Sequence, residues 1–174
     1  PDIIGSDWSV WGGIDGSASN SNPNTTLGDY RWVNYKVSYD FVLDTHTPEI
    51  EGRSNYALIG VRQIKAGGED SHAPYNARVY SDGKYEILKL GKVVDNGEIE
   101  KFDNKIWHNL ALEAKENEFT LYLDKKEIAT YIDENSTVMA GRVVIGSGYY
   151  ETLIDNLRID PIKGYTYKSE KYDS

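Results

Sequence analysis

Residues 106–132, IWHNLALEAKENEFTLYLDKKEIATYI, decide the fold because they read as three strands joined by two short polar turns. Apolar side chains occupy alternate positions of the first strand, at Leu110 and Leu112, and of the second strand, at Phe119 and Leu121. Such alternation places one set of side chains on a buried face of a sheet. An antiparallel meander of this size is not stable alone, so the rest of the chain must supply a second sheet over its apolar face.

Other segments with strand character flank this meander on both sides. They are 7–13, 32–43, 55–63, the hairpin formed by 75–80 and 84–90, and the closing strands 142–148 and 152–160. About ten short strands separated by turn residues, with no sustained helical periodicity, predict an antiparallel β-sandwich with jelly-roll connectivity. We therefore expect an all-β fold in which residues 1–160 form one domain and residues 161–174 form a polar tail or linker.

Composition excludes several classes of function. The 174 residues include no cysteine, so no disulfide holds the fold and no thiol is available for chemistry. The net charge of −9 argues against binding to nucleic acid or to an anionic membrane surface. No apolar run approaches transmembrane length. Tyrosine is abundant, with 14 residues against 3 phenylalanines. Tyrosine rings suit half-exposed sheet positions and also stack on sugars, so their abundance fits both β-propensity and glycan binding.

Several segments match patterns of a known jelly-roll family. They read W-x-x-Y-x-V-x-x-D-F over 32–41, W-H-x-L-x-L over 107–112, Y-L-D then K-x-I-A over 122–129, G-x-V-x-I-G over 141–146 and I-D-N-L-R-I over 154–159. Together they resemble a concanavalin A-like, laminin-G-like domain, and most closely the C-terminal lectin-like domain of family 59 glycoside hydrolases, the galactocerebrosidase type. The resemblance covers nearly all of residues 5–160. It implies carbohydrate binding, with a β-galactoside or related glycan as the ligand.

Catalysis is not expected, although the same fold hosts glycosidases. Those enzymes need two carboxylates that face each other across the substrate. Here Asp133 and Glu134 are adjacent and point to opposite faces, Glu116 and Glu118 stand at a hairpin end, and Asp40 is alone on its strand. The three histidines are not spaced as a zinc site.

Sugar recognition in water needs an aromatic platform and planar polar groups that hydrogen-bond to hydroxyls. Arg62 is predicted to project from the face opposite the core, either as a ligand donor or as half of a surface ion pair. Asn76, Arg78 and Tyr80 alternate on the next strand and are predicted to share a face. Loop and turn positions complete the candidate ligand-binding set: Trp11, Asp70, His72, Tyr75, Tyr149 and Tyr150.

The family resemblance also implies a structural calcium ion, with Asp155 as a ligand and Asp15 as a possible partner. Backbone carbonyls would complete the oxygen ligands that this hard cation prefers. The alternative for Asp155 is a hydrogen bond to backbone amides.

These observations predict a non-catalytic carbohydrate-binding module of a larger secreted or cell-surface enzyme. Its partners would be an oligo- or polysaccharide and the catalytic module of the same polypeptide, and the domain itself would be a monomer. A laminin-G-like protein-interaction domain is the main alternative, and a glycoside hydrolase is less favoured. The sequence does not identify the sugar.

Overall fold

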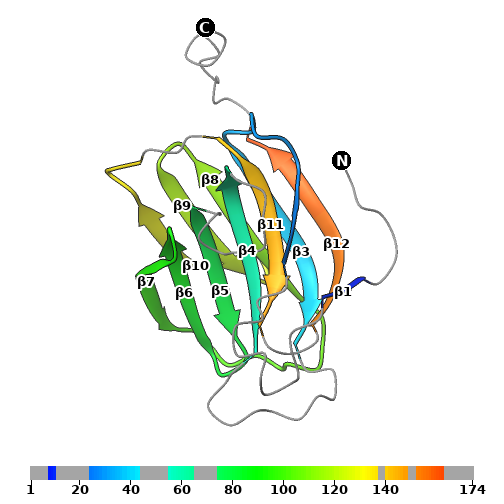
Figure 1. The fold of residues 1–174 in the computed structure, drawn as a ribbon. Helices are drawn as coiled ribbons and strands as arrows, with labels where there is room; N and C mark the ends of the chain where they lie inside the picture. The colour runs from blue at the N-terminus through cyan, green and yellow to red at the C-terminus, as the bar shows by residue number, and fades with distance from the viewer. Residues whose placement is uncertain are drawn as a thin grey trace, which may run out of the picture.

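Two six-stranded antiparallel sheets stacked face to face form the whole of the described structure (Figure 1). It is a computed structural model and describes residues 8–10, 24–43, 55–64, 74–136, 140–148 and 152–162. These residues contain strands, turns and loops but no helix, and hence no helix that could span a membrane. The all-β sandwich predicted from the sequence is confirmed.

The first sheet contains the meander and has the strand order β1-β12-β3-β8-β9-β10. Its strands are β1 (Trp8–Val10), β3 (Tyr35–Val42), β8 (His108–Lys115), β9 (Glu118–Leu123), β10 (Lys126–Ile132) and β12 (Thr152–Pro161). The meander therefore ends at β10, which is one edge of this sheet. The last strand, β12, lies between β1 and β3, so the two ends of the described chain meet in this sheet.

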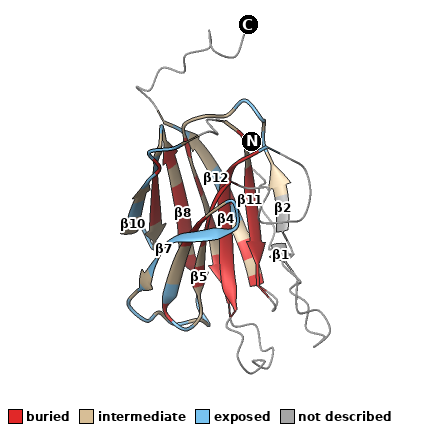
Figure 2. Ribbon diagram, turned by 60° about the vertical axis from the view of Figure 1, so that its left-hand side comes forward, coloured by how far each residue is buried: buried red, intermediate tan, exposed pale blue. Residues whose placement is uncertain are grey.

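The second sheet has the order β2-β11-β4-β5-β6-β7. Its strands are β2 (Asn24–Leu27), β4 (Tyr56–Gln63), β5 (Tyr75–Tyr80), β6 (Lys84–Lys89), β7 (Lys92–Glu98) and β11 (Arg142–Ser147). Figure 2 shows the buried residues concentrated in the inner strands, whereas β7 at the edge is largely exposed. The edge strands β10 and β7 belong to the first and the second sheet, respectively.

The core lies between the two sheets and is built from alternate residues of each strand. Tyr39 and Phe41 of β3 face Ile59 of β4, and all three side chains are fully buried. Tyr39 also donates a hydrogen bond across the core to the carbonyl oxygen of Leu58, at 2.6 Å. This bond satisfies a phenol that would otherwise be buried without a partner.

Two strands lie where the sequence carries little strand signal. β2 lies in residues 14–28, whose Gly, Ser, Asn and Thr content predicts a loop, and β7 lies in the polar stretch 91–103, for which the sequence allows only a short strand. Both are edge strands, and β7 is polar on most positions, so neither carries the apolar alternation that reveals a half-buried strand. The signal for β7 is its turn: Leu90 and Gly91 have φ angles of 51° and 80°, the left-handed pair of a tight hairpin.

Candidate functional site

The candidate site lies on the outer face of the second sheet, which is the face turned away from the core. On β5, Asn76, Arg78 and Tyr80 alternate with the core residues Ala77 and Val79. The prediction that these three side chains share a face is confirmed. Antiparallel pairing then places Gly60, Leu58 and Tyr56 of β4 beside them on one side and Glu86 of β6 beside Arg78 on the other.

A linked group of four side chains occupies this face, and we call it the outer cluster: Tyr56, Arg78, Tyr80 and Glu86. The Arg78 guanidinium stands 4.6 Å from the centre of the Tyr56 ring. The Tyr56 and Tyr80 rings lie 5.3 Å apart in a tilted arrangement. Tyr80 donates its hydroxyl hydrogen to Glu86 Oε1. Each group is therefore oriented by another member before any ligand arrives.

Electrostatics keep the Tyr80 phenol protonated. Burial, and then the hydrogen bond to the Glu86 carboxylate, raise the pKa of Tyr80 to about 12, against a smaller opposing effect of Arg78. At neutral pH this hydroxyl is a donor, and the carboxylate beside it is an acceptor. Adjacent donor and acceptor groups of this kind match the hydroxyl groups of a sugar.

A hollow of about 550 Å³ adjoins the outer cluster, and we call it the outer hollow. Its walls come from the end of β5, from β6 and from β7. The lining residues are Tyr80, Asp82, Lys84, Tyr85, Glu86, Asn96, Gly97 and Glu98. Carboxylates, an amide, a phenol and aromatic rings thus converge on a space of the size that small ligands occupy.

The other end of this face is closed to a ligand. Leu58 and Val144 are buried there beside Tyr56 in a second apolar cluster, separate from the main core. Asn76 is only 1% exposed, whereas Arg78 and Tyr80 are partly exposed. Of the three predicted β5 residues, Arg78 and Tyr80 are therefore the ones that a ligand can reach in this structure.

Arg62 does not project from the outer face, so the predicted position of its side chain is wrong. It is fully buried, and its guanidinium lies 5.0 Å from the centre of the Phe119 ring in the first sheet. Its Nε donates to the carbonyl oxygen of Val33 and its Nη2 to Asn34 Oδ1, at 3.1 and 3.2 Å. The cause is local: Arg62 has a φ of 59°, and the pairing of β4 with β11 shifts register there. A bulge of this kind breaks the alternation of faces.

Tyr75 also lies inside the sandwich. It is 1% exposed, and its ring stacks on Phe119 with centroids 3.9 Å apart. Its hydroxyl donates to Asp133 Oδ2 at 2.5 Å, and Lys89 Nζ lies 2.7 Å from the same carboxylate oxygen. Burial raises the pKa of Asp133, but the hydrogen bonds from Lys89 and Tyr75 outweigh it and the net pKa is lowered. Tyr75 is therefore placed to hold the two sheets together, away from the outer cluster.

The remaining predicted ligand-binding residues lie outside the described part of the chain: Trp11, Asp70, His72, Tyr149 and Tyr150. Their proposed roles stay predictions. Trp107, by contrast, is described. Its place at the start of the meander predicts a structural, packed residue, but its side chain is 45% exposed.

The proposed calcium ligand Asp155 lies on β12 opposite Asp40 of β3. Its Oδ1 accepts the backbone N–H of Asn156 at 2.8 Å. Both Asp40 carboxylate oxygens accept amide hydrogens, one from Asn109 and one from Asn156. Within the described residues no three acidic, histidine or cysteine side chains gather as a metal site, and Asp15 lies outside them. The described neighbours of Asp155 do not by themselves fit calcium.

Sequence reasoning missed every lining residue of the outer hollow except Tyr80, and it also missed Tyr56 of the outer cluster. Glu86 could have been found, because the turn at 81–83 sets a hairpin register in which Glu86 faces Arg78. Asn96 and Glu98 lie on β7, where polar residues at most positions hide the alternation that would assign each side chain to a face.

The two-sheet jelly roll is a fold that this chain shares with lectin-like domains. Residues 11–162 match the family described as galactocerebrosidase, C-terminal lectin domain, and the chain belongs to that family. No curated protein matches the chain.

Solved structures share this fold at low sequence identity. Carbohydrate-binding module CBM66 from Bacillus subtilis is 16% identical with a TM-score of 0.55, over 80% of this chain and 81% of that chain. Sheep galectin-11, solved in complex with glycerol, is 15% identical with a TM-score of 0.53, over 79% and 96%. A Bacillus subtilis protein with a galectin-like fold is 12% identical with a TM-score of 0.55, over 90% and 89%. Identities this low establish the common fold alone.

Proposed function

We propose that this domain is a non-catalytic carbohydrate-binding module whose ligand occupies the outer hollow. The observation that carries this proposal is the outer cluster, in which Tyr80 and Glu86 present a fixed donor and acceptor beside that hollow. A sugar hydroxyl can replace one partner of such a bond without leaving the other unsatisfied. The ring of Tyr80 supplies apolar surface for a sugar face.

The carboxylates of the hollow serve recognition in this proposal. Glu86 accepts the Tyr80 hydroxyl hydrogen, and Asp82 forms an ion pair with Lys84. Hydrolysis of a glycosidic bond would require one free acid and one free base or nucleophile on opposite sides of the bond. We therefore expect binding without release of products, which chromatography of oligosaccharides after incubation with the domain will check.

The biological role that we propose is targeting. A binding module in a secreted or cell-surface polypeptide raises the local concentration of its catalytic partner at a glycan. The family to which the chain belongs makes galactose-containing glycans the first ligands to test. The domain would act as a monomer in this role.

A protein-interaction role is the second candidate. Ile106 and Trp107 are adjacent before β8 and are 52% and 45% exposed. An exposed tryptophan beside an aliphatic side chain is the kind of anchor that protein interfaces use. Substitution Trp107→Ala would abolish partner capture under this candidate and leave glycan binding unchanged under the first.

Calcium remains a proposal as well, in which Asp155 and Asp15 share one ion. Its test is thermal unfolding with calcium and with EDTA, using Asp155→Asn as the variant. A calcium-dependent rise in melting temperature that this variant removes would support the proposal. Equal melting temperatures in calcium and EDTA would contradict it.

Affinity electrophoresis against a panel of soluble polysaccharides tests the carbohydrate-binding proposal. We expect retardation by at least one neutral polysaccharide, weakened in Tyr80→Phe and in Glu86→Gln. Matched controls come from the outer face of the first sheet, where Tyr122→Phe and Glu113→Gln change the same residue types at half-buried positions. Retardation lost equally in controls and test variants, or no retardation by any glycan, would overturn the proposal.

A further inference from the structure

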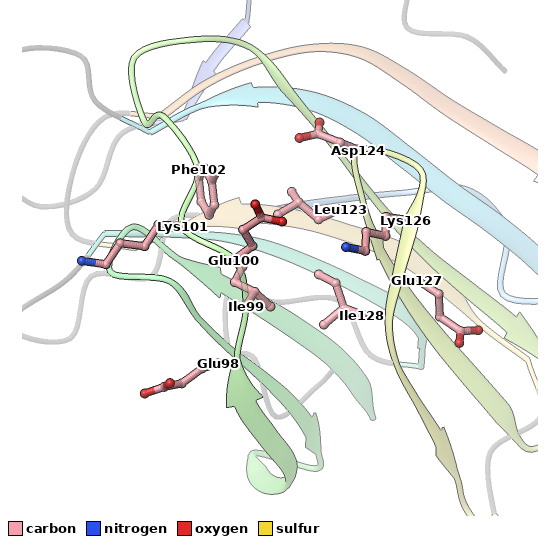
Figure 3. Close-up of a pocket in the computed structure, with 10 residues that line it drawn as sticks. All are labelled: Glu98, Ile99, Glu100, Lys101, Phe102, Leu123, Asp124, Lys126, Glu127 and Ile128. Atoms are coloured by element: carbon pink, nitrogen blue, oxygen red, sulfur yellow. The ribbon is translucent and has the colours of Figure 1, made fainter.

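A second cavity lies on the side of the sandwich, between the free edges of the two sheets. Its volume is about 470 Å³. One wall is the end of β7 with the loop that follows it, and the other is the hairpin of β9 and β10 (Figure 3). We call it the edge groove. It differs from the outer hollow in its walls and shares only Glu98 with it.

The floor of the edge groove is apolar. Ile99 and Phe102 from the first wall and Leu123 and Ile128 from the second are partly buried and pack against the core. Ile128 reaches the groove because a register shift in β10 lies between Glu127 and Ala129. Phe102 makes edge-to-face contacts with Phe41 and His108, which fix the position of its ring in the floor.

The groove is also lined by Asp124, whose carboxylate accepts the Asn109 N–H and contacts the His108 ring. Beside it, two opposite charges without such contacts point into the mouth of the groove from opposite walls. Figure 3 shows the Glu100 carboxylate and the Lys126 ammonium group turned toward the cavity, whereas Glu98, Lys101 and Glu127 point away from it. Both Glu100 and Lys126 are exposed. Among the described residues, neither takes part in an ion pair. The two groups are therefore available to a ligand.

We propose that the edge groove binds a small zwitterion with an apolar side chain, the chemistry of a hydrophobic amino acid. The ligand ammonium group would meet Glu100, its carboxylate would meet Lys126, and its side chain would cover Ile99, Leu123 and Ile128. A cavity of this volume is in the range that holds small ligands. The floor is apolar, with three aliphatic side chains beside one phenylalanine ring and no amide side chain among its lining residues, so it fits an apolar body better than a sugar.

The probe is L-leucine, followed by NMR through the methyl signals of Ile99, Leu123 and Ile128 in the whole chain. We expect saturable shifts at these methyls. Exposed ion pairs contribute little each, so loss of either ligand charge should weaken binding by roughly two- to fivefold. Isoamylamine lacks the carboxylate and 4-methylpentanoate lacks the ammonium group, and L-serine keeps both charges without the apolar body. L-serine should produce no saturable shift.

Matched variants separate the groove from its surroundings. Glu100→Gln should weaken leucine but leave 4-methylpentanoate unchanged, and Lys126→Gln should weaken leucine but leave isoamylamine unchanged. Glu127→Gln and Lys101→Gln alter charges that point away and should have no effect. Equal binding of leucine, its two single-charge analogues and serine would overturn the proposal. So would the absence of saturable methyl shifts, or equal losses in the Glu127 and Glu100 variants.

Discussion

The two faces of the second sheet hold similar pairs of residues in opposite surroundings. Inside the sandwich, Arg62 and Tyr75 both pack on the ring of Phe119. On the outer face, Arg78 and Tyr80 both contact the ring of Tyr56. Each tyrosine also donates its hydroxyl hydrogen to a carboxylate, Asp133 inside and Glu86 outside.

The difference between the pairs is accessibility. The inner pair is at most 1% exposed, and the outer pair is partly exposed beside the outer hollow. Residue type and hydrogen-bonding chemistry therefore do not separate a structural arginine–tyrosine pair from a candidate ligand-binding one. The face on which each side chain stands separates the structural pair from the candidate ligand-binding pair. The four predictions below test whether that distinction holds.

The largest expected effect is on stability, in Tyr75→Ala. Removing a buried aromatic ring leaves a cavity and should cost about 3–5 kcal/mol of unfolding free energy. Tyr80→Ala should cost clearly less, because its ring is partly exposed. Urea unfolding followed by tryptophan fluorescence measures both values. Equal losses would show that the outer tyrosine is as structural as the inner one.

Arg62→Ala should cause the next largest loss of unfolding free energy. The substitution leaves the Val33 carbonyl without its buried donor, a loss of about 1–3 kcal/mol, whereas Asn34 Oδ1 keeps the N–H of Glu116. Arg78→Ala loses a cation–π contact, which is worth about 0.5–1 kcal/mol at an exposed site, and an interaction with Tyr80 on the same partly exposed face. The same urea experiment compares the two, and a greater loss in Arg78→Ala would contradict the assignment of faces.

Ligand affinity should depend on the outer residues, whereas stability depends more on the inner ones. Tyr80→Phe removes the hydroxyl but keeps the ring, and we expect the affinity for a retained polysaccharide to fall roughly tenfold, or about 1.4 kcal/mol. Calorimetry with that polysaccharide measures the change. Tyr122→Phe is the control because its ring is also half-buried, under Lys36 on the first sheet. Unchanged affinity in Tyr80→Phe would remove Tyr80 from the binding site.

Acid should lower the stability of the protein through Asp133, the carboxylate that accepts the Tyr75 hydroxyl hydrogen inside the sandwich. The pKa of Asp133 is lowered in the folded state by Lys89 and Tyr75, against burial, so its carboxylate contributes stability that is fully present above the ordinary value of 3.8. That contribution is lost as the pH falls below 3.8 through the folded pKa, because protonation then favours the unfolded chain. Urea midpoints between pH 7 and pH 2.5 should fall less steeply in Asp133→Asn. Parallel curves would show that Asp133 does not carry this dependence.

Part of the candidate site follows from local sequence. Alternation along β5 places Asn76, Arg78 and Tyr80 on one face, and the turn at 81–83 sets the register that brings Glu86 to Arg78. Alternation fails at Arg62, because a left-handed residue at a bulge reverses the face, and nothing in the sequence marks the bulge. Alternation along a strand also does not tell which of two polar faces remains open to solvent.

The amino-acid sequence by itself determined the class of fold. Period-two alternation in residues 106–132 and its repetition along the chain require two sheets around one core, because each strand has only one apolar face to bury. Tertiary structure alone decided which residues are accessible. Tyr75 and Asp133 are 58 positions apart, and Arg62 reaches the ring of Phe119 on the other sheet. Contacts between distant segments form only when the sheets pack, so local patterns cannot encode them.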